Sequence, residues 1–176
     1  MKNKIKLLSI FFCICVTPCH AVDGVAVIAG TGEDADMMAI SVQWDWEKRW
    51  FTEGDWWLGG YWELDGSYWK SEDSGANDIY GIGITPVFRL QRSEINHVMP
   101  YIELGIGAHV FSEKTVHDDK RMGTNFQFGD HIGTGIRFGQ YLNYDLGYRF
   151  QHYSNAGISN SNPGINFHEL RLRYNF

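Results

Sequence analysis

A histidine and a serine lie two residues apart near the end of this 176-residue chain, in the run His152-Tyr153-Ser154-Asn155. An imidazole can take the proton of a nearby serine hydroxyl and make the oxygen a nucleophile, which is the first requirement of an esterase. The spacing matters because alternate residues of a β-strand point to the same face. On its own, such a pair is more often an interfacial polar pair than a catalytic one. The strands that contain the two residues are therefore needed to distinguish the two roles.

Two neighbouring segments with strict alternation would position this pair. In the segment 140–153 one face is apolar and consists of Leu142, Tyr144, Leu146, Tyr148 and Phe150. The next two residues at alternate positions, His152 and Ser154, lie on the same face. In the segment 165–176 the apolar face consists of Leu170, Leu172, Tyr174 and Phe176. The preceding residues at alternate positions, His168 and Asn166, lie on the same face. If the segments pair antiparallel, His152, Ser154 and Asn166 form one patch at an end of the sheet. His168 is interpreted as interfacial packing.

The rest of the chain supplies enough strands to close a barrel. Eight alternating segments are predicted, at 23–31, 36–46, 55–69, 77–90, 98–112, 124–138, 140–153 and 165–176. Eight antiparallel strands of about ten residues make the smallest outer-membrane β-barrel, whose interior is filled by side chains. Seven Trp, nine Tyr, eleven Phe and twenty Gly suit aromatic girdles and close packing, and the last strand ends on an aromatic, Phe176. The expected ion-paired lumen contains Glu103, Asp145, Arg149, Glu169, Arg171 and Arg173.

The alternation alone does not say which face is inside. A soluble sandwich or lipocalin-like barrel would turn its apolar face inward and its polar face to water. The start of the chain favours the membrane, because Lys2, Lys4 and Lys6 precede an apolar run at 7–16 and a small-residue site ending at Ala21. Residues 1–21 are therefore predicted to be a cleaved signal peptide, whose apolar run is too short to span a bilayer, and 22–176 to be a single barrel.

Removal of that segment would change the cysteine content and the charge. All three cysteines, Cys13, Cys15 and Cys19, lie in it. A lipoprotein signal with Cys19 as the lipid-bearing residue fits poorly, because Pro18 precedes this cysteine. Three lysines also leave, so 12 basic residues face 21 acidic ones, a net charge of −9. An acidic chain is a poor candidate for binding nucleic acid. No metal is assigned, since His109, His117 and His131 lack ligand spacing.

An even number of strands puts alternate connections on opposite sides of the membrane. With both ends in the periplasm, the connections near 32–35, 70–76, 113–123 and 154–164 face the exterior, and those near 47–54, 91–97 and 139 the periplasm. The His152–Ser154 patch then lies at the outer leaflet. Lys114, Lys120 and Arg121 in the third outer loop could meet lipopolysaccharide phosphates, or simply be solvated beside the acids of that loop.

The run HYSNAG at 152–157, with Asn162, Gly164 and Ile165 after it, resembles the signature of the PagL family of outer-membrane lipid A 3-O-deacylases. The resemblance implies a serine esterase that removes the acyl chain ester-linked at position 3 of lipid A, without a cofactor and among outer-membrane lipids. It further implies that Ser154 is the nucleophile and His152 the general base. Candidates to hold the oxyanion are Asn155, Asn162 and the backbone N–H groups around Ala156 and Gly157.

The sequence departs from the family at one position. The third member of the family's triad is typically a glutamate, and Asn166 stands there. Its amide oxygen can accept the histidine N–H, but it carries no charge to stabilise an imidazolium. The nearest acid, Glu169, has the parity of the lumen and is expected to pair with Arg171 and Arg173. A working but slower enzyme is predicted.

Two other functions stay open from the sequence. One is a non-enzymatic small barrel for adhesion or envelope structure, whose Ser154 and His152 would tolerate alanine. The other is a phospholipase or lipase built on the same residues. The acyl-chain preference and the choice between monomer and homodimer are also open.

Overall fold

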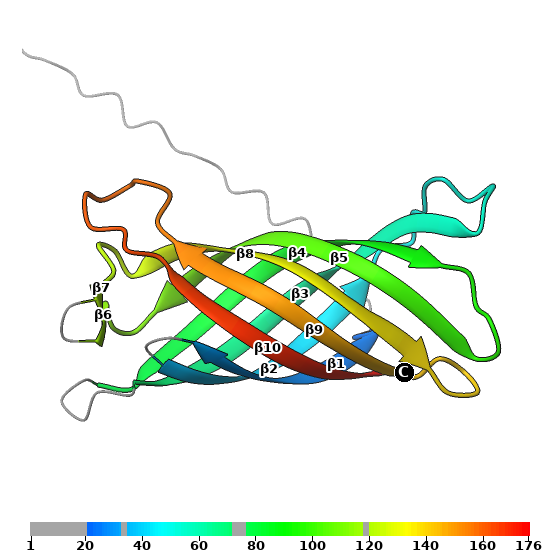
Figure 1. Ribbon diagram of the computed structural model, residues 1–176, viewed down its shortest axis with the longest axis horizontal. Coiled ribbons are helices and arrows are strands. Elements are labelled where there is room, and N and C mark those ends of the chain that lie inside the picture. Colours follow the sequence, from blue (N-terminus) through cyan, green and yellow to red (C-terminus); the bar gives the residue numbers. More distant parts are fainter. Residues whose placement is uncertain (1–20, 33–34, 72–76, 118–119) are drawn as a thin grey trace, which may run out of the picture.

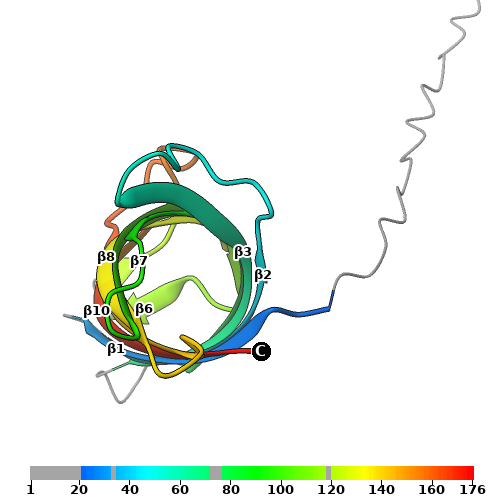
Figure 2. The same cartoon turned by 90° about the vertical axis from the view of Figure 1, so that its right-hand side faces the viewer.

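The computed structural model describes residues 21–32, 35–71, 77–117 and 120–176, and eight of its strands close an antiparallel barrel in the order β1-β10-β9-β8-β5-β4-β3-β2 (Figures 1 and 2). The barrel strands are β1 (Gly24–Gly32), β2 (Ala35–Asp45), β3 (Trp56–Ser71), β4 (Ile79–Arg92), β5 (Val98–Phe111), β8 (Phe126–Phe138), β9 (Tyr144–Ser154) and β10 (Ile165–Asn175). Two short strands, β6 (Thr115–His117) and β7 (Lys120–Arg121), pair with each other outside the barrel wall. The predicted eight-stranded barrel is confirmed.

Two segments differ from the prediction. The strand predicted at 140–153 begins at Tyr144, because a turn with Gly139 at φ 98° and Leu142 at φ 55° reverses the chain first. Leu142 therefore does not belong to the outward face of β9. The connection predicted over 113–123 contains the β6–β7 hairpin. The predicted signal peptide lies outside the described residues, except for Ala21.

The apolar faces of the strands point outward and the polar faces inward. Along β10, buried and exposed residues alternate without a break. Exposed side chains include Ile40, Ile106, Ile132 and Leu170, each more than 60% accessible, while Glu103, Asp145 and Arg149 are buried. This arrangement suits a barrel whose surroundings are lipid and excludes the soluble alternative, which would have buried the aliphatic face. The described residues form no helix that is long and apolar enough to cross a membrane.

Buried ion pairs fill the middle of the barrel. Arg89 lies 2.6 Å from Glu103 and 2.7 Å from Asp145. Arg149 lies 2.7 Å from Glu63 and 2.8 Å from Glu103. Further hydrogen bonds come from Tyr61 to Glu103, from Tyr101 to Asp145 and from Arg171 to Asp145. Three guanidinium groups thus face three carboxylates, and the predicted ion-paired lumen is confirmed as a packed core.

The prediction that Glu169 pairs with Arg171 and Arg173 is wrong. Glu169 is buried in the lumen, as its parity predicted. Arg171 pairs with Asp145 at 3.1 Å, however, and Arg173 pairs with Asp45 at 2.8 Å. Within the described part of the chain no ion pair reaches Glu169. Parity decides which face a side chain takes, but the stagger of tilted strands decides which charges meet across the lumen.

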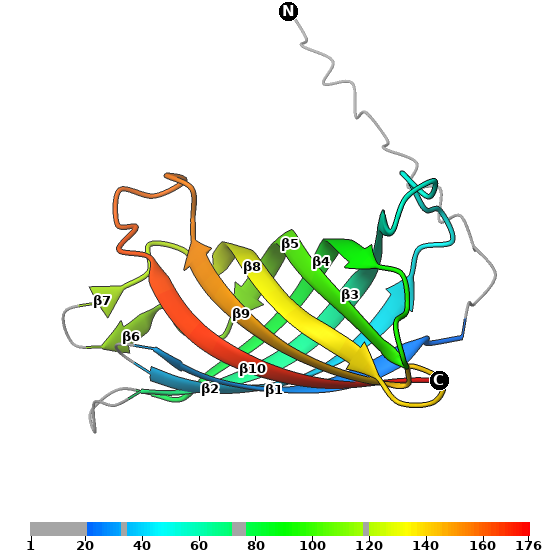
Figure 3. The ribbon, with the colours of Figure 1, turned by 45° about the vertical axis from the view of Figure 1, so that its right-hand side comes forward.

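The two ends of the barrel carry different connections (Figures 1 and 3). The β9–β10 connection and the β6–β7 hairpin lie at one end, and the C-terminus, the β2–β3 connection and the turn at 139–143 lie at the other. This is the separation of connections that the strand count predicted. An aromatic cluster fills the lumen toward the end that carries the β9–β10 connection: Trp69 packs on Phe111, Tyr153 and Phe167, with ring centroids 4.3–5.0 Å apart.

Candidate active site

The end of β9 and the start of β10 bring His152 and Asn166 together. The two residues are direct cross-strand partners in the antiparallel ladder, as the parity of the two segments predicted. The Nδ1 atom of His152 lies 2.6 Å from Oδ1 of Asn166. An amide oxygen is an acceptor, so Nδ1 donates its proton and Nε2 is left as the basic nitrogen of the ring. The asparagine thus fixes both the tautomer and the orientation of the imidazole.

Ser154 is the last residue of β9 and is half-buried on the same face as His152. Its neighbour on β8 is Phe128, which packs edge-on against Phe126 at 5.0 Å between ring centroids. No hydrogen bond joins Ser154 to His152 in the part of the chain that the structure describes. In enzymes without bound substrate such bonds are commonly long, and they shorten when the substrate is bound. The serine therefore lies beside a base and an aromatic wall, at the edge of the lipid-facing surface.

Two buried aromatic residues that are adjacent in sequence to the site residues hold the site in place from the lumen side. Tyr153, between His152 and Ser154, is buried and packs on Trp69 at 5.0 Å and edge-on to Phe111 at 5.4 Å. Phe167, the neighbour of Asn166, is also fully buried, with its ring 4.9 Å from Trp69. Because alternate residues point inward and outward, a rigid aromatic core behind the wall holds the polar residues in front of it.

Asn155 organises the loop that follows Ser154. Its side chain is fully buried; Oδ1 accepts the N–H groups of Gly157 at 3.0 Å and Ser159 at 3.3 Å. Its Nδ2 donates to the carbonyl of Ser161 at 2.8 Å, and its backbone N–H donates to Oδ1 of Asn162 at 2.8 Å. The backbone N–H of Asn155, one N–H of its side-chain amide and the N–H of Gly157 are thus already used within the loop.

Two other hydrogen-bond donors at this turn have no partner among the described residues. Ala156 has φ 50° and Gly157 φ 81°, so the chain turns sharply in the left-handed region just after Ser154. Within the described residues, neither the N–H of Ala156 nor the side-chain Nδ2 of Asn162 has a hydrogen-bond partner. Two N–H groups beside a nucleophile are the kind of arrangement that can hold an oxyanion.

Gly164 leaves room for the imidazole ring. Its φ is 70°, and a methyl group built on its Cα would lie 2.7 Å from Cε1 of His152. A residue with a side chain at this position would be strained and would also push the ring away from Asn166.

We expect Gly164→Ala to lower kcat by about tenfold to a hundredfold, because a displacement of about 1 Å in a catalytic group can cost that much. The measurement is the turnover of folded protein in detergent. Gly139→Ala is the control: its φ of 98° is also unfavourable for a residue with a side chain, and it lies at the opposite end of the barrel. Equal losses of activity in the two variants would mean that general strain is responsible.

Sequence reasoning passed over one residue of this surface. Asp130 on β8 is the direct cross-strand partner of His152, on the side opposite to Asn166. The alternation of 124–138 placed Ile132, Thr134, Ile136 and Phe138 on the outward face, and one further step back by two would have reached Asp130. Among the described residues no group of three or more His, Asp or Glu side chains is arranged to hold a metal ion.

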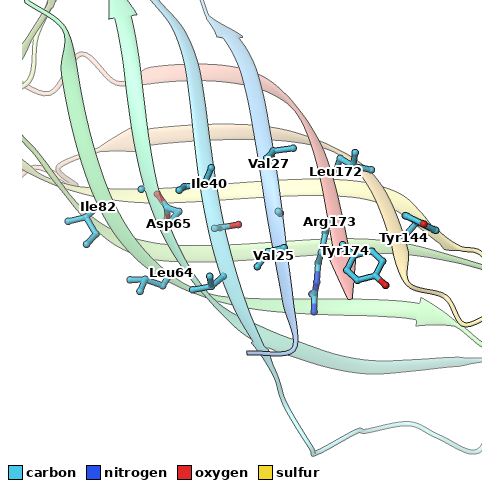
Figure 4. A pocket seen from close by; sticks show the side chains of 14 residues that line it. Val25, Val27, Ile40, Leu64, Asp65, Ile82, Tyr144, Leu172, Arg173 and Tyr174 are labelled. Atoms are coloured by element: carbon cyan, nitrogen blue, oxygen red, sulfur yellow. The ribbon is translucent and has the colours of Figure 1, made fainter. Parts of the chain in front are cut away.

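A separate hollow lies on the outer wall, away from these residues (Figure 4). It has a volume of about 620 Å³, and its apolar lining includes Val27, Ile40, Leu64, Ile82 and Leu172. Neither His152 nor Ser154 lines it. A lining that is mainly aliphatic suits acyl chains of the surrounding lipid.

Comparison with known proteins identifies the family of the chain. The profile of the family described as "Lipid A 3-O-deacylase (PagL)" matches residues 37–175. The lipid A deacylase PagL of Pseudomonas aeruginosa is 33% identical over 155 residues, which cover 88% of this chain and 87% of that protein. The lipid A deacylase PagL of Bordetella bronchiseptica is 42% identical over 115 residues, 65% of this chain and 61% of that protein.

Solved structures give the same result. The crystal structure of the outer-membrane enzyme PagL superimposes with a TM-score of 0.77 at 30% identity, over 87% of this chain and 99% of that one. Neisserial surface protein A shares the fold, with a TM-score of 0.53 at 13% identity over 87% of this chain and 94% of that one. By profile, sequence and structure, the chain belongs to the PagL family of lipid A 3-O-deacylases.

Proposed function

We propose that this outer-membrane barrel is a serine esterase that hydrolyses the ester-linked 3-hydroxyacyl chain at position 3 of lipid A. The observation that carries the proposal is the 2.6 Å contact between His152 Nδ1 and Asn166 Oδ1. Ser154 lies on the same lipid-facing side of the barrel wall as this pair. Membership of the PagL family supports the choice of substrate. Residues 1–21 would direct export, and the site would face the outer leaflet, where lipid A lies.

In the acylation step, Nε2 of His152 takes the proton of Ser154 Oγ as the oxygen attacks the ester carbonyl. The oxyanion that forms would be held by the N–H of Ala156 and by Nδ2 of Asn162, the two donors that the loop does not use. Collapse of the tetrahedral intermediate breaks the ester bond, and the sugar oxygen leaves with the proton from the imidazolium. Water then attacks the acyl-serine by the same route and releases the free 3-hydroxy fatty acid. Asn155 supports the loop through its hydrogen bonds to Gly157, Ser159 and Ser161.

The substrate would reach Ser154 from the membrane side. Ion pairs and aromatic rings fill the lumen, so no path leads through it. Apart from Asp130, the outward face of β8 beside the site is apolar, with Phe128 beside Ser154, and Ile132 and Phe150 of β9 farther into the membrane. An acyl chain can lie along this surface while its ester group meets Ser154 at the membrane interface, so the bilayer supplies much of the binding.

The test is hydrolysis of purified lipid A by the purified barrel in detergent. Mass spectrometry is expected to show the loss of one 3-hydroxyacyl group. Lipid A that already lacks the chain at position 3 is the control substrate and is expected to stay intact. Hydrolysis of phospholipids with lipid A left intact would establish the phospholipase alternative, and a folded barrel inactive on both would support a structural role.

Asn166 provides a prediction about the rate. We expect Asn166→Glu to raise kcat by about tenfold with little change in KM, because a carboxylate stabilises the imidazolium more than an amide does. Asn166→Ala is expected to lower kcat, since the ring loses its only hydrogen-bond partner among the described residues. Steady-state turnover of lipid A measures both. A silent Asn166→Ala would contradict the orienting role of the asparagine.

A further inference from the structure

A small pocket with a cationic lining lies at the end of the barrel that carries the C-terminus, the end that the strand count predicts to face the periplasm. Its lining comes from the β2–β3 connection and from β2, β3, β4, β8 and β10, and its volume is about 50 Å³. The described residues that line it supply one carboxylate and four guanidinium groups, those of Asp45, Arg49, Arg89, Arg137 and Arg173. In the middle of the barrel three guanidinium groups face three carboxylates, so the excess of positive charge distinguishes this pocket.

Two of the four guanidinium groups are not neutralised by a carboxylate. Arg89 belongs to the lumen network, and Arg173 pairs with Asp45 at 2.8 Å. Within the described residues, neither Arg49 nor Arg137 takes part in an ion pair. Arg137 donates to a backbone carbonyl at 3.2 Å, and Arg49 lies 4.2 Å from the centroid of an indole ring. Because uncompensated like charges repel one another, the pocket favours an anion.

Two buried N–H groups of the lining residues also lack an acceptor. Nε of Arg173 and Nε1 of Trp46 are buried and have no hydrogen-bond partner among the described residues. Both atoms can only donate a hydrogen bond. A buried donor without a partner costs free energy, and an anion in the pocket can accept from it.

We propose that this pocket binds one phosphate group, either free phosphate or the phosphodiester of a phospholipid headgroup at the membrane interface. Guanidinium groups suit this ligand because their N–H donors can bind two phosphate oxygens at once. A volume of about 50 Å³ admits such a group, whereas a water molecule needs about 10–15 Å³. The bound phosphate links the β2–β3 connection, through Arg49, to the ends of β8 and β10, through Arg137 and Arg173, and it stabilises this end of the barrel.

The first test measures the urea concentration at which the barrel unfolds in alkyl maltoside micelles, which contain no phosphate. Sodium phosphate is expected to raise this midpoint in a saturable way relative to sodium chloride at equal ionic strength, because phosphate binds the folded barrel. Arg49→Gln and Arg137→Gln are each expected to weaken the apparent affinity by about tenfold to a hundredfold, the range for a hydrogen bond to a charged group. Arg49 is exposed in a connection, so its substitution keeps the test decisive if Arg137→Gln disturbs the strand ends.

Arg92→Gln is the matched control. Arg92 is the last residue of β4, at the same end of the barrel, where it pairs with Asp55 at 3.5 Å and does not line the pocket. The substitution removes the same charge and is expected to leave the effect of phosphate unchanged.

The second test distinguishes the two sources of phosphate. In phosphate-free buffer, the maltoside micelles receive either phosphatidylglycerol or an uncharged glycolipid. A higher midpoint with phosphatidylglycerol that is lost in Arg49→Gln identifies the headgroup as a ligand, and an effect of inorganic phosphate that is lost in the same variant identifies the free anion.

Three results would overturn the inference. The first is a barrel that neither inorganic phosphate nor phosphatidylglycerol stabilises beyond the effect of chloride or glycolipid. The second is an undiminished effect in Arg49→Gln and Arg137→Gln, which would place the anion elsewhere. The third is an equal loss in Arg92→Gln, which would mean that the total charge of this end is responsible. None of these readouts depends on deacylase activity.

Discussion

Replacement of Ser154 by alanine is expected to lower the turnover of lipid A by about 10⁴-fold or more, with the barrel still folded. The hydroxyl is the proposed nucleophile, and without it only binding and the oxyanion donors contribute to catalysis. Loss of the hydroxyl should have little effect on the fold, since no hydrogen bond of Ser154 Oγ is present among the described residues. The readouts are kcat from fatty-acid release and heat-modifiable migration of the folded barrel in gels.

Ser159→Ala is the control for this variant. Ser159 lies in the same loop, and its backbone N–H donates to Asn155 while its hydroxyl has no assigned role. Loss of that hydroxyl is expected to change turnover by no more than about twofold. If Ser154→Ala kept more than a tenth of the wild-type rate, another group would be the nucleophile.

Replacement of Glu103 by glutamine is expected to lower the free energy of unfolding by about 3–5 kcal/mol. Glu103 accepts hydrogen bonds from Arg89 at 2.6 Å, from Arg149 at 2.8 Å and from Tyr61 at 3.0 Å, and it is buried. The substitution keeps the volume but leaves three buried guanidinium groups to share two carboxylates. Removing one member of a buried charge network strands the others away from water, which is the reason for the large expected cost.

Urea unfolding of the barrel in lipid vesicles measures this loss. The matched control is Asp55→Asn, which breaks the exposed pair between Asp55 and Arg92 at 3.5 Å. An exposed pair contributes at most about 1 kcal/mol. Equal losses in the two variants would mean that the lumen network does not stabilise the fold.

Much of this architecture could be predicted from the period of the strands. Strict alternation located all eight barrel strands, and its parity placed His152 and Asn166 on one face. The same parity put Glu103, Asp145 and Arg149 in the lumen. Alternation has this power because a shift of one residue would exchange the two faces of a strand.

The errors arose where alternation carries no information. The turn at Gly139 and Leu142 is set by backbone conformation, so β9 begins later than the apolar pattern suggested. The partners of Arg171 and Arg173 depend on the stagger of strands across the lumen, which a single strand does not reveal. The use of Asn155 donors within the loop and the position of Asp130 beside His152 likewise depend on contacts between segments.

The most direct test of the account is covalent trapping of the nucleophile. A fluorophosphonate bearing an alkyl chain reacts with an activated serine and leaves a stable phosphonyl ester. After incubation with the folded barrel, peptide mass spectrometry is predicted to find one adduct, on Ser154, which forms much more slowly in His152→Asn. Absence of an adduct on Ser154 in a preparation that deacylates lipid A, or an adduct on a different residue that abolishes activity, would contradict the account.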